Sequence, residues 1–252
     1  MRYRLTEPTT PDGRLYATLI ADGLTSGDHL QSLNGEPVDY TFTTNTDTDL
    51  ENTVLFTNGG PHPDKFYAVF TSGYIPDDNP RRFPFAPGIV SEYTKHTLTK
   101  RVPINRRAND IAVLGFKDSI LATAITNEFN NKIVVDLNDV TYPDKYLVLS
   151  QSKIIVYNRN HPTAQWEAAS SGGILMATNH EYNRFGFDLH PKHRITFNNQ
   201  AHLLSSIWHV FSALLQNQAL ADSAWNSARR YHTAFVRMKY VLNALKNIDT
   251  AI

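Results

Sequence analysis

Residues 110–126 have the sequence DIAVLGFKDSILATAIT, in which two apolar runs are separated by a glycine and a short polar segment. Each run has the length and the Val, Ile, Leu and Ala content of a strand, so 110–116 and 119–126 are predicted as successive strands. Short strands that follow each other closely, without helices between them, favour an antiparallel sandwich over alternating βαβ units.

Similar runs continue on both sides of this stretch. Apolar and polar residues alternate over 38–43, with Val38, Tyr40 and Phe42 on one face, which predicts a half-buried strand. Further predicted strands cover residues 53–57, 66–71, 132–137, 145–150, 153–158, 173–177, 184–190 and 193–197. Asn, Asp, Gly and Pro separate these runs and indicate turns between the strands.

Both ends of the chain carry helical patterns instead. Leu15 and Leu19 share a face of a short helix that is predicted over 11–22. After the last strand, apolar residues recur at steps of three and four and predict two helices. Asn198 or Asn199 can cap the first of these helices, and Asp222 can cap the second.

The fold class expected from these patterns is α+β, with a β-sandwich core, a short N-terminal helix and C-terminal helices. We expect a single domain over residues 1–252. It would comprise an N-terminal arm or helix over 1–31, the sandwich over 32–197 with a long loop over 72–107, and a helical C-terminal part over 198–252. The loop is rich in Pro and Arg, and it is either a binding surface or an extended arm with solvated charges.

Composition limits the classes of function. The chain has 252 residues, no cysteine, and 24 Lys and Arg against 24 Asp and Glu. Without cysteine there is no disulfide, thiolate metal site or cysteine nucleophile. A formal charge of zero argues against a nucleic-acid partner, which usually demands a basic excess. The apolar runs are far shorter than a membrane-spanning helix requires, so no membrane partner is expected.

The motifs that could carry chemistry are weak. Residues 54–70, VLFTNGGPHPDKFYAVF, fail the phosphate-loop pattern because Lys65 is followed by Phe66, and the segment is predicted to be a reverse turn. His190 and His193 flank a proline, and no third ligand stands at a diagnostic spacing from them. A GxSxG motif is absent as well. We therefore predict no catalytic residue, no metal site and no enzyme.

Several short stretches, taken in order, resemble a known family. They are SLNGE (32–36), TYPDKYL (141–147), HPTAQWEA (161–168), HEYN (180–183) and AHLLSSIWHVFSALL (201–215). Their order is similar to that of the cypovirus polyhedrins, which crystallise in infected insect cells and encase virus particles. The resemblance implies a β-sandwich protein that forms trimers and packs, with embedded virions, into a crystalline occlusion body.

The resemblance carries further implications. The N-terminal helix of that family reaches neighbouring trimers, so Leu15, Tyr16 and Leu19 become candidate assembly anchors. Family members also bind nucleoside triphosphates (ATP, GTP or CTP), with contacts that cannot be assigned here. The protein would lie in occlusion bodies in the host cytoplasm, and later in the environment and the insect midgut.

Alkaline dissolution would follow from the 12 tyrosines and the lysines, whose titration above roughly pH 10 makes the packed chains repel each other. Two alternatives stay open. One is another viral assembly protein, such as a capsid or nucleocapsid subunit. The other is a hydrolase or a sugar-binding sandwich that uses the 72–107 loop.

Overall fold

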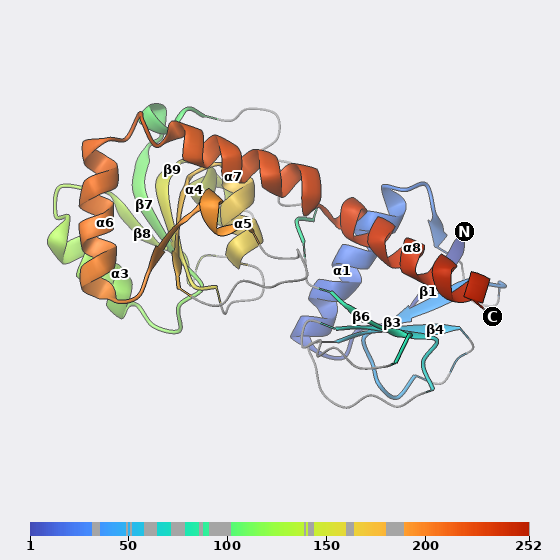
Figure 1. The fold of residues 1–252 in the computed structure, drawn as a ribbon. Helices are drawn as coiled ribbons and strands as arrows, with labels where there is room; N and C mark the ends of the chain where they lie inside the picture. Colours follow the sequence, from blue (N-terminus) through green and yellow to red (C-terminus); the bar gives the residue numbers. More distant parts are fainter. Residues whose placement is uncertain are drawn as a thin grey trace. The chain divides into compact units, whose positions relative to one another are not determined.

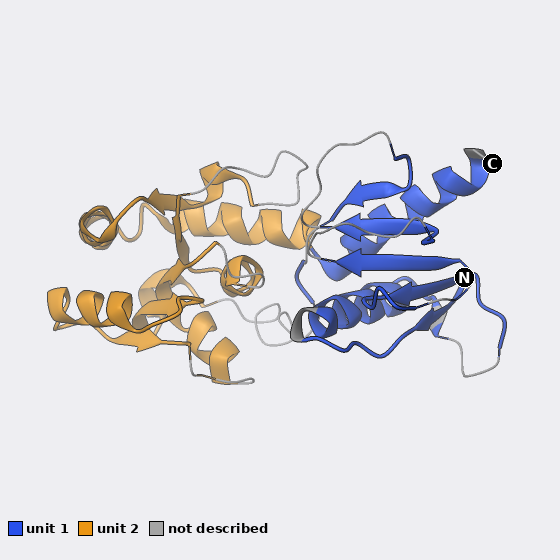
Figure 2. Cartoon of the chain, turned by 90° about the horizontal axis from the view of Figure 1, so that it is seen from below, with its two compact units in different colours: residues 1–90, 233–252 blue, residues 91–232 orange. Residues whose placement is uncertain are grey.

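The computed structural model describes most of the chain as two compact units. The described residues are 1–31, 36–48, 50, 52–57, 65–71, 79–85, 88–90, 102–138, 140, 144–159, 164–179 and 189–251. Unit 1 comprises residues 1–90 and 233–252, and unit 2 comprises residues 91–232 (Figure 2). Each unit has its own sheet, and every strand pairing in both sheets is parallel.

Unit 1 contains a six-stranded sheet in the order β2-β1-β3-β4-β5-β6 (Figure 1). Its strands are β1 (Arg2–Leu5), β2 (Leu30–Gln31), β3 (Tyr40–Thr43), β4 (Thr53–Thr57), β5 (Ala68–Thr71) and β6 (Arg82–Pro84). Near-continuous burial of β4 and β5 fits strands covered on both faces, as in parallel sheets generally.

The helices in the described part of unit 1 are α1 (Pro11–Thr25) and α8 (Ala234–Ala251), and they pack against each other. Helix α1 begins with proline at its first position, and the hydroxyl of Thr10 accepts a hydrogen bond from the Gly13 amide at 3.0 Å. From α1, the buried ring of Tyr16 packs against Phe56 and Phe85. Aromatic packing of this kind supplies much of the apolar burial in the unit.

Unit 2 contains a five-stranded sheet in the order β11-β10-β9-β7-β8. Its strands are β7 (Asn109–Leu114), β8 (Val134–Asp136), β9 (Ser152–Tyr157), β10 (Ile174–Thr178) and β11 (Ile195–Phe197). Its helices are α3 (Ile120–Glu128), α4 (Asp144–Ser150), α5 (Ala164–Ser171), α6 (Gln200–Ser212) and α7 (Gln218–Tyr231), with 3-10 turns η1 (Ile104–Arg106) and η2 (Pro191–His193).

Helices lie on both faces of the unit 2 sheet (Figure 1). Helices α3 and α6 contribute to one apolar core with alternate residues of the strands, including Ile111, Val113 and Ile154, while α4 and α5 contact the sheet outside that cluster. Buried Arg107 donates hydrogen bonds to the carbonyls of Ser152 at 2.8 Å and Gly172 at 2.9 Å. This guanidinium satisfies backbone acceptors at the amino ends of β9 and β10.

The predicted antiparallel sandwich is wrong. The fold class is α/β, because the described strands form two parallel sheets with flanking helices instead of two antiparallel layers. Two predicted strands, 119–126 and 145–150, form helices α3 and α4. The sandwich expected over 32–197 is instead divided between unit 1 and unit 2, where a single domain had been expected.

Other element predictions are confirmed. The helix expected over 11–22 is α1, and the strands expected over 53–57, 110–116 and 153–158 are β4, β7 and β9. Asn199 caps α6 by accepting from the amide of His202 at 2.9 Å. The second C-terminal helix differs from its prediction, because α7 begins after Asn217 and the chain breaks into α7 and α8.

Some predictions fall on residues outside the described ranges. They include the reverse turn within 58–64, most of the predicted strand 184–190, and the stretches 72–78, 86–87 and 91–101 of the long loop. The described part of that loop contains β6 and η1. None of the described helices has the length and apolar character that crossing a membrane requires.

Candidate functional site

The strand order of unit 2 makes one edge of its sheet the candidate ligand site. From β7 the chain moves to β8 on one side, then returns to β9 on the other side of β7. The loops after β7 and β9 therefore leave the sheet in opposite directions. In open parallel sheets, ligands bind outside the carboxyl ends of the strands at such a point of divergence.

The loop after β7 comprises residues 115–119 with the sequence GFKDS. Gly115 has a φ of 77°, a left-handed conformation that costs glycine little and other residues more. The carboxylate of Asp118 accepts a hydrogen bond from the amide of Ile120 at 3.2 Å and so fixes the start of α3. Lys117 and Ser119 are exposed in the same loop, which presents a cation beside the amino end of a helix.

The loop after β9 begins with Asn158 and Arg159, both half-buried. The Asn158 amide donates to the carbonyl of Leu114 at 3.1 Å, so β7 and β9 stay paired up to the edge. The Arg159 amide donates to the hydroxyl of Thr178, at the end of β10, at 3.3 Å. These contacts hold the backbone of the second loop beside the neighbouring strand ends.

A buried carboxylate lies just behind this edge. Glu167 is in the first turn of α5, the helix that follows β9, and it is 2% exposed. Its Oε2 forms an ion pair of 2.7 Å with Nζ of Lys145 in the first turn of α4. Burying an ion pair costs desolvation energy that only good geometry offsets. Its position beside the carboxyl edge of the sheet makes Glu167 a candidate for ligand binding.

A cavity of about 360 Å³ adjoins the first loop through Ser119. It is lined by residues of α3, including Thr123 and Asn127, and by Asp136 at the end of β8. The hydroxyl of Ser119 and the carboxylate of Asp136 therefore line the cavity at the same edge of the sheet, and Thr123 and Asn127 line it farther along α3. Pockets of this size accommodate parts of small-molecule ligands.

Together, these groups can recognise an anion with attached hydroxyls. Lys117 and the first-turn amides of α3 favour a negatively charged ligand. Arg159 adds a second cationic residue at the start of the neighbouring loop. A carboxylate such as Glu167 accepts hydrogen bonds from hydroxyls, as acidic residues do with ribose in dinucleotide sites. This chemistry fits a nucleoside diphosphate better than a metal ion. Among the described residues, no group of three or more His, Cys, Asp or Glu side chains could hold a metal.

Unit 1 has a comparable point of divergence, between β1 and β3. Three threonine hydroxyls form a chain there: Thr6 lies 2.7 Å from Thr43, and Thr43 lies 2.8 Å from Thr48. They follow the carboxyl ends of their strands, at the same edge as the start of α1. Among the described residues, this point of divergence thus holds a chain of neutral hydroxyls, in contrast to the exposed lysine in the loop after β7 of unit 2.

The residues singled out from the sequence lie elsewhere. Of the candidate anchors in α1, Tyr16 and Leu19 are buried in unit 1 and Leu15 is half-buried. His193 accepts or donates a hydrogen bond with Ser223 at 2.7 Å; burial lowers its pKa, and nearby Lys192, His190 and Arg194 lower it further. The GFKDS loop was missed, although an apolar run, a glycine and a polar segment before a second apolar run is the usual signature of a βα loop.

Comparisons with known proteins give no relative by sequence. No protein-family model matches the chain. No curated protein matches it either. Similarity to solved structures, however, extends over the whole chain.

A glycosyltransferase from Rickettsia africae superposes with a TM-score of 0.62 at 11% identity, covering 98% of each chain. An α1,3-fucosyltransferase with GDP gives 0.57 at 13% identity, covering 98% of this chain and 89% of the other. A structure named as a UDP-N-acetylglucosamine 2-epimerase from Listeria monocytogenes gives 0.56 at 12%, covering 100% and 97%. The chain has the GT-B fold. At these identities, the similarity establishes the fold and leaves the activity open.

The GT-B fold corrects the interpretation as a cypovirus polyhedrin. A fold with two parallel sheets that is shared with glycosyltransferases is incompatible with the β-sandwich on which that resemblance depended. The predicted occlusion-body function, the trimers in a lattice with embedded virions, and the location in host cytoplasm and insect midgut are therefore wrong. So are the capsid or nucleocapsid alternative and the expectation that the chain is not an enzyme.

One earlier expectation fits at a coarse level. Nucleotide binding is compatible with the GT-B fold, because one of the similar structures was determined with GDP. The specific choice of ATP, GTP or CTP came from the polyhedrin resemblance and has no further support.

Proposed function

We propose that this chain is a glycosyltransferase that transfers a sugar from a nucleoside diphosphate sugar to an acceptor. The observation that carries the proposal is the similarity over 98% of both chains to a glycosyltransferase. The carboxyl edge of unit 2 supports it independently, because its cations and helix start suit a diphosphate.

Unit 2 is proposed to bind the donor. Lys117 and the amides at the start of α3 would contact the diphosphate, and Arg159 would add a second cation. Glu167 would accept hydrogen bonds from the ribose hydroxyls, with the ammonium of Lys145 paired to its carboxylate. The cavity beside α3 provides further polar groups for the remainder of the donor.

In the proposed reaction, the cations of the donor site lie beside the leaving diphosphate. The bond between the anomeric carbon and the diphosphate oxygen breaks, and its electron pair leaves with the diphosphate. The acceptor oxygen forms the new bond, and its hydroxyl proton is released. Cations at the leaving diphosphate stabilise the charge that develops there, which is the largest contribution in many enzymes.

Binding of GDP and UDP, measured by isothermal titration calorimetry, tests the diphosphate contact. Replacing Lys117→Ala is expected to weaken binding about tenfold, or ~1.4 kcal/mol, because a charge-assisted contact is lost. Lys192→Ala is the matched control, since this exposed lysine lies in η2, before the amino end of β11. Equal affinities for the two variants would contradict the assignment of Lys117.

The ribose contact has a control of its own. Glu167→Gln removes the charge of the pair with Lys145 and is expected to weaken nucleotide binding about tenfold. Asp110→Asn breaks a similar pair with Lys153, 2.6 Å long, at the amino ends of the strands. Both variants should lose stability, but only Glu167→Gln should lose nucleotide affinity. If both bind like the wild type, the proposed donor site is wrong.

A second candidate is an epimerase that acts on a nucleotide sugar, because a structure named as such an enzyme has the same fold. The two activities differ in their products. A transferase releases free nucleoside diphosphate only slowly until an acceptor is added, whereas an epimerase converts the sugar of its substrate without one. Incubation with GDP- and UDP-sugars, with and without a mixture of simple saccharides, followed by mass spectrometry and NMR of the products, separates them.

A further inference from the structure

A second cavity, of about 600 Å³, lies in unit 1 at the amino ends of the strands. This is the edge opposite to the one where the strands of an open parallel sheet bind their principal ligand. Its polar lining comprises His29, Asp39, Tyr40, Asn52, Lys246 and Asp249. Tyr40 is the first residue of β3, and the other side chains come from the segments that precede β2, β3 and β4 and from the last turns of α8. Nothing in the proposed donor site uses this cavity.

A carboxylate in this cavity is held by two phenols. The hydroxyl of Tyr40 donates to Oδ2 of Asp249 at 2.5 Å, and the hydroxyl of Tyr67 donates to Oδ1. Asp249 lies near the carboxyl end of α8, where the helix dipole disfavours an anion. Two hydrogen bonds offset that cost, and they fix the two rings 5.7 Å apart.

The phenols remain hydrogen-bond donors at any ordinary pH. Burial, together with the hydrogen bond and the charge of Asp249, raises the pKa of Tyr67 to about 12. The same causes raise the pKa of Tyr40 above its ordinary value. Tyr40 therefore presents a neutral hydroxyl and an aromatic ring to the cavity, not a phenolate.

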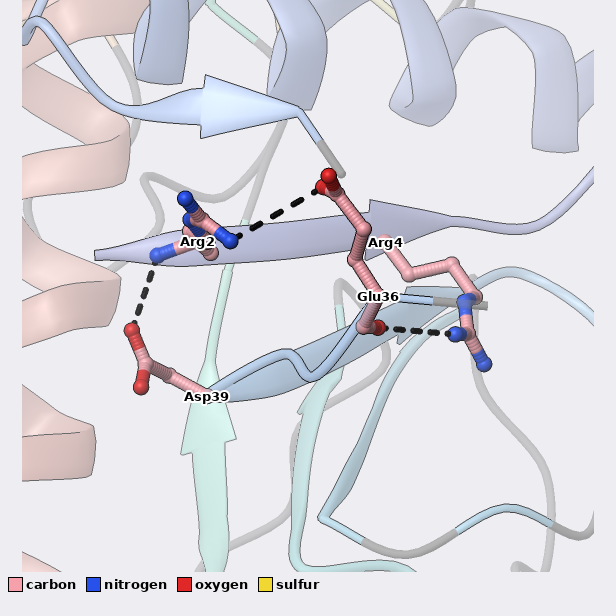
Figure 3. Close-up of polar contacts among 4 residues, drawn as sticks. All are labelled: Arg2, Arg4, Glu36 and Asp39. Atoms are coloured by element: carbon pink, nitrogen blue, oxygen red, sulfur yellow. Dashed lines mark hydrogen bonds and ion pairs between the residues drawn. The ribbon is translucent and has the colours of Figure 1, made fainter. Parts of the chain in front are cut away.

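Asp39, another residue of the lining, is also held by polar contacts (Figure 3). The backbone amide of Arg2 donates to Oδ2 of Asp39 at 2.8 Å. The side chain of Arg4 donates to the carbonyl of Glu36 at 3.4 Å, and the guanidinium of Arg2 lies 3.9 Å from the Glu36 carboxylate. These contacts tie β1 to the segment that leads into β3, so Asp39 has a defined position.

The chemistry of this lining selects a neutral, polyhydroxylated ligand. Two carboxylates face an incoming anion, which disfavours phosphates and nucleotides. Both carboxylates already accept hydrogen bonds, and Lys246 stands beside them, which disfavours a cation. Polar side chains around most of the cavity disfavour an apolar ligand. Hydroxyl groups, which donate and accept, can satisfy Asp39, Asn52 and Lys246 at once.

We propose that this cavity at the amino edge of unit 1 binds a saccharide. The site is separate from the proposed donor site and goes beyond the proposed transferase reaction. A sugar ring placed against Tyr40 would bury its apolar face on the aromatic ring and hydrogen-bond to the surrounding carboxylate, amide and ammonium groups. A volume of this size falls in the range of small-molecule sites.

Titration of the ¹⁵N-labelled full-length chain with methyl α-glucoside, methyl β-galactoside, methyl α-mannoside and chitobiose tests the proposal by NMR. At least one of these probes is expected to shift amide signals of residues 36–40 and 242–249 with saturation. Lys246→Ala removes an exposed donor, and Tyr40→Phe removes only the hydroxyl. Each should weaken binding of that probe at least fivefold, while GDP binding stays unchanged.

Lys239→Ala is the control, because this exposed lysine lies on the same helix but does not line the cavity. It should bind the probe like the wild type. The proposal is overturned if no probe shifts these signals in folded protein, or if a probe binds equally well to Lys246→Ala and Lys239→Ala. Because GDP affinity is measured alongside, failure of the saccharide site is distinguishable from failure of the donor site.

Discussion

Two lysine–carboxylate pairs stand at opposite ends of the strands of unit 2. Glu167 and Lys145 lie behind the carboxyl edge, and Asp110 and Lys153 lie at the amino edge. Burial alone would raise the pKa of Asp110, but hydrogen bonds from Lys153 and from the Ile133 amide lower it overall. The two pairs have similar geometry and differ in position. We therefore assign a role in stability to the pair at the amino edge and a role in binding to the pair at the carboxyl edge.

Asp110→Asn is expected to reduce the free energy of unfolding by ~1.5–3 kcal/mol at pH 7, the usual range for hydrogen bonds to charged groups. A lowered pKa in the folded state stabilises the fold above the unfolded pKa of about 3.9, and that contribution is lost as pH falls through the folded value. The difference between wild type and variant should therefore shrink at about pH 3. Urea unfolding at both pH values measures it, and a difference that stays constant with pH would contradict the ion pair.

Tyr40 and Tyr67 give a second pH-dependent prediction. Their raised pKa values stabilise the fold below about pH 10, and this contribution is lost as pH rises toward 12. Ultraviolet titration of the wild type should contain a late-ionising component from Tyr40 and Tyr67, with Tyr67 near pH 12. In Asp249→Asn both should move toward 10, because the charge of the acceptor is gone. A titration curve identical in both proteins would exclude the proposed network.

Two helices of unit 2 show why the elements were only partly predictable. In α3 the buried residues are Ala122 and Ile125, three apart, followed by Phe129 beyond the end of the apolar run. In α4 they are Tyr146 and Leu149, while Leu147 is 62% exposed. Each of these short runs contains only two buried residues at helical spacing, which is too few to show a helical period. Their length and their Ile, Leu and Val content therefore suggested strands.

The same ambiguity hid the candidate site. Once residues 110–116 and 119–126 are both taken as strands, only Lys117 and Asp118 remain between them as a turn, and no carboxyl edge exists. Read as a helix, the same residues form the βα loop that presents Lys117. Glu167 had no local signal at all, because its pairing with Lys145 depends on the packing of α4 against α5.

The contact between α1 and α8 gives a prediction at the scale of elements. A Cβ on Gly23 would lie 2.5 Å from the carbonyl oxygen of Ala234 and from Cγ of Met238. Gly23→Ala should therefore force the helices apart and destabilise unit 1 by ~1–3 kcal/mol, as overpacking does. Thermal unfolding followed by circular dichroism measures the loss.

Gly27→Ala serves as the control for this change. A Cβ there meets the side chain of His29 at 3.2 Å, which can move, and lies at an ordinary contact distance of 3.5 Å from the carbonyl oxygen of Leu24. We expect a small effect, from neutral to ~1 kcal/mol more stable, because alanine reduces the entropy of the unfolded chain. A loss at Gly27 equal to that at Gly23 would contradict the close contact between α1 and α8 as the cause of the loss at Gly23.

For the whole molecule, strand positions were predictable and strand direction was not. Residues 44–52, 58–67 and 72–81 connect parallel neighbours in unit 1, although such crossovers usually need a dozen or more residues and a helix. Closely spaced strands thus suggested antiparallel pairing. Only the pairing of the strands in three dimensions resolves their direction.

The two units differ in how many segments of the chain form them. Unit 2 is continuous, whereas unit 1 requires α8 from the far end of the chain. Helix α8 buries Met238, Val241, Leu245 and Ile248 almost completely. At about 1.5–3 kcal/mol for each buried side chain, these four contribute roughly 6–12 kcal/mol, comparable to the stability of a whole domain.

A chain that ends at His232 should therefore lose unit 1 and keep unit 2, because the lost burial matches what holds a domain folded. In ¹H–¹⁵N spectra of fragment 1–232, signals of residues 102–232 should stay dispersed, while those of 1–90 collapse to unfolded positions. Fragment 91–232 should show one cooperative thermal transition by circular dichroism. Dispersed signals from 1–90 without α8, or a fragment 91–232 that fails to fold, would mean that the units do not have the separate cores that their contacts indicate.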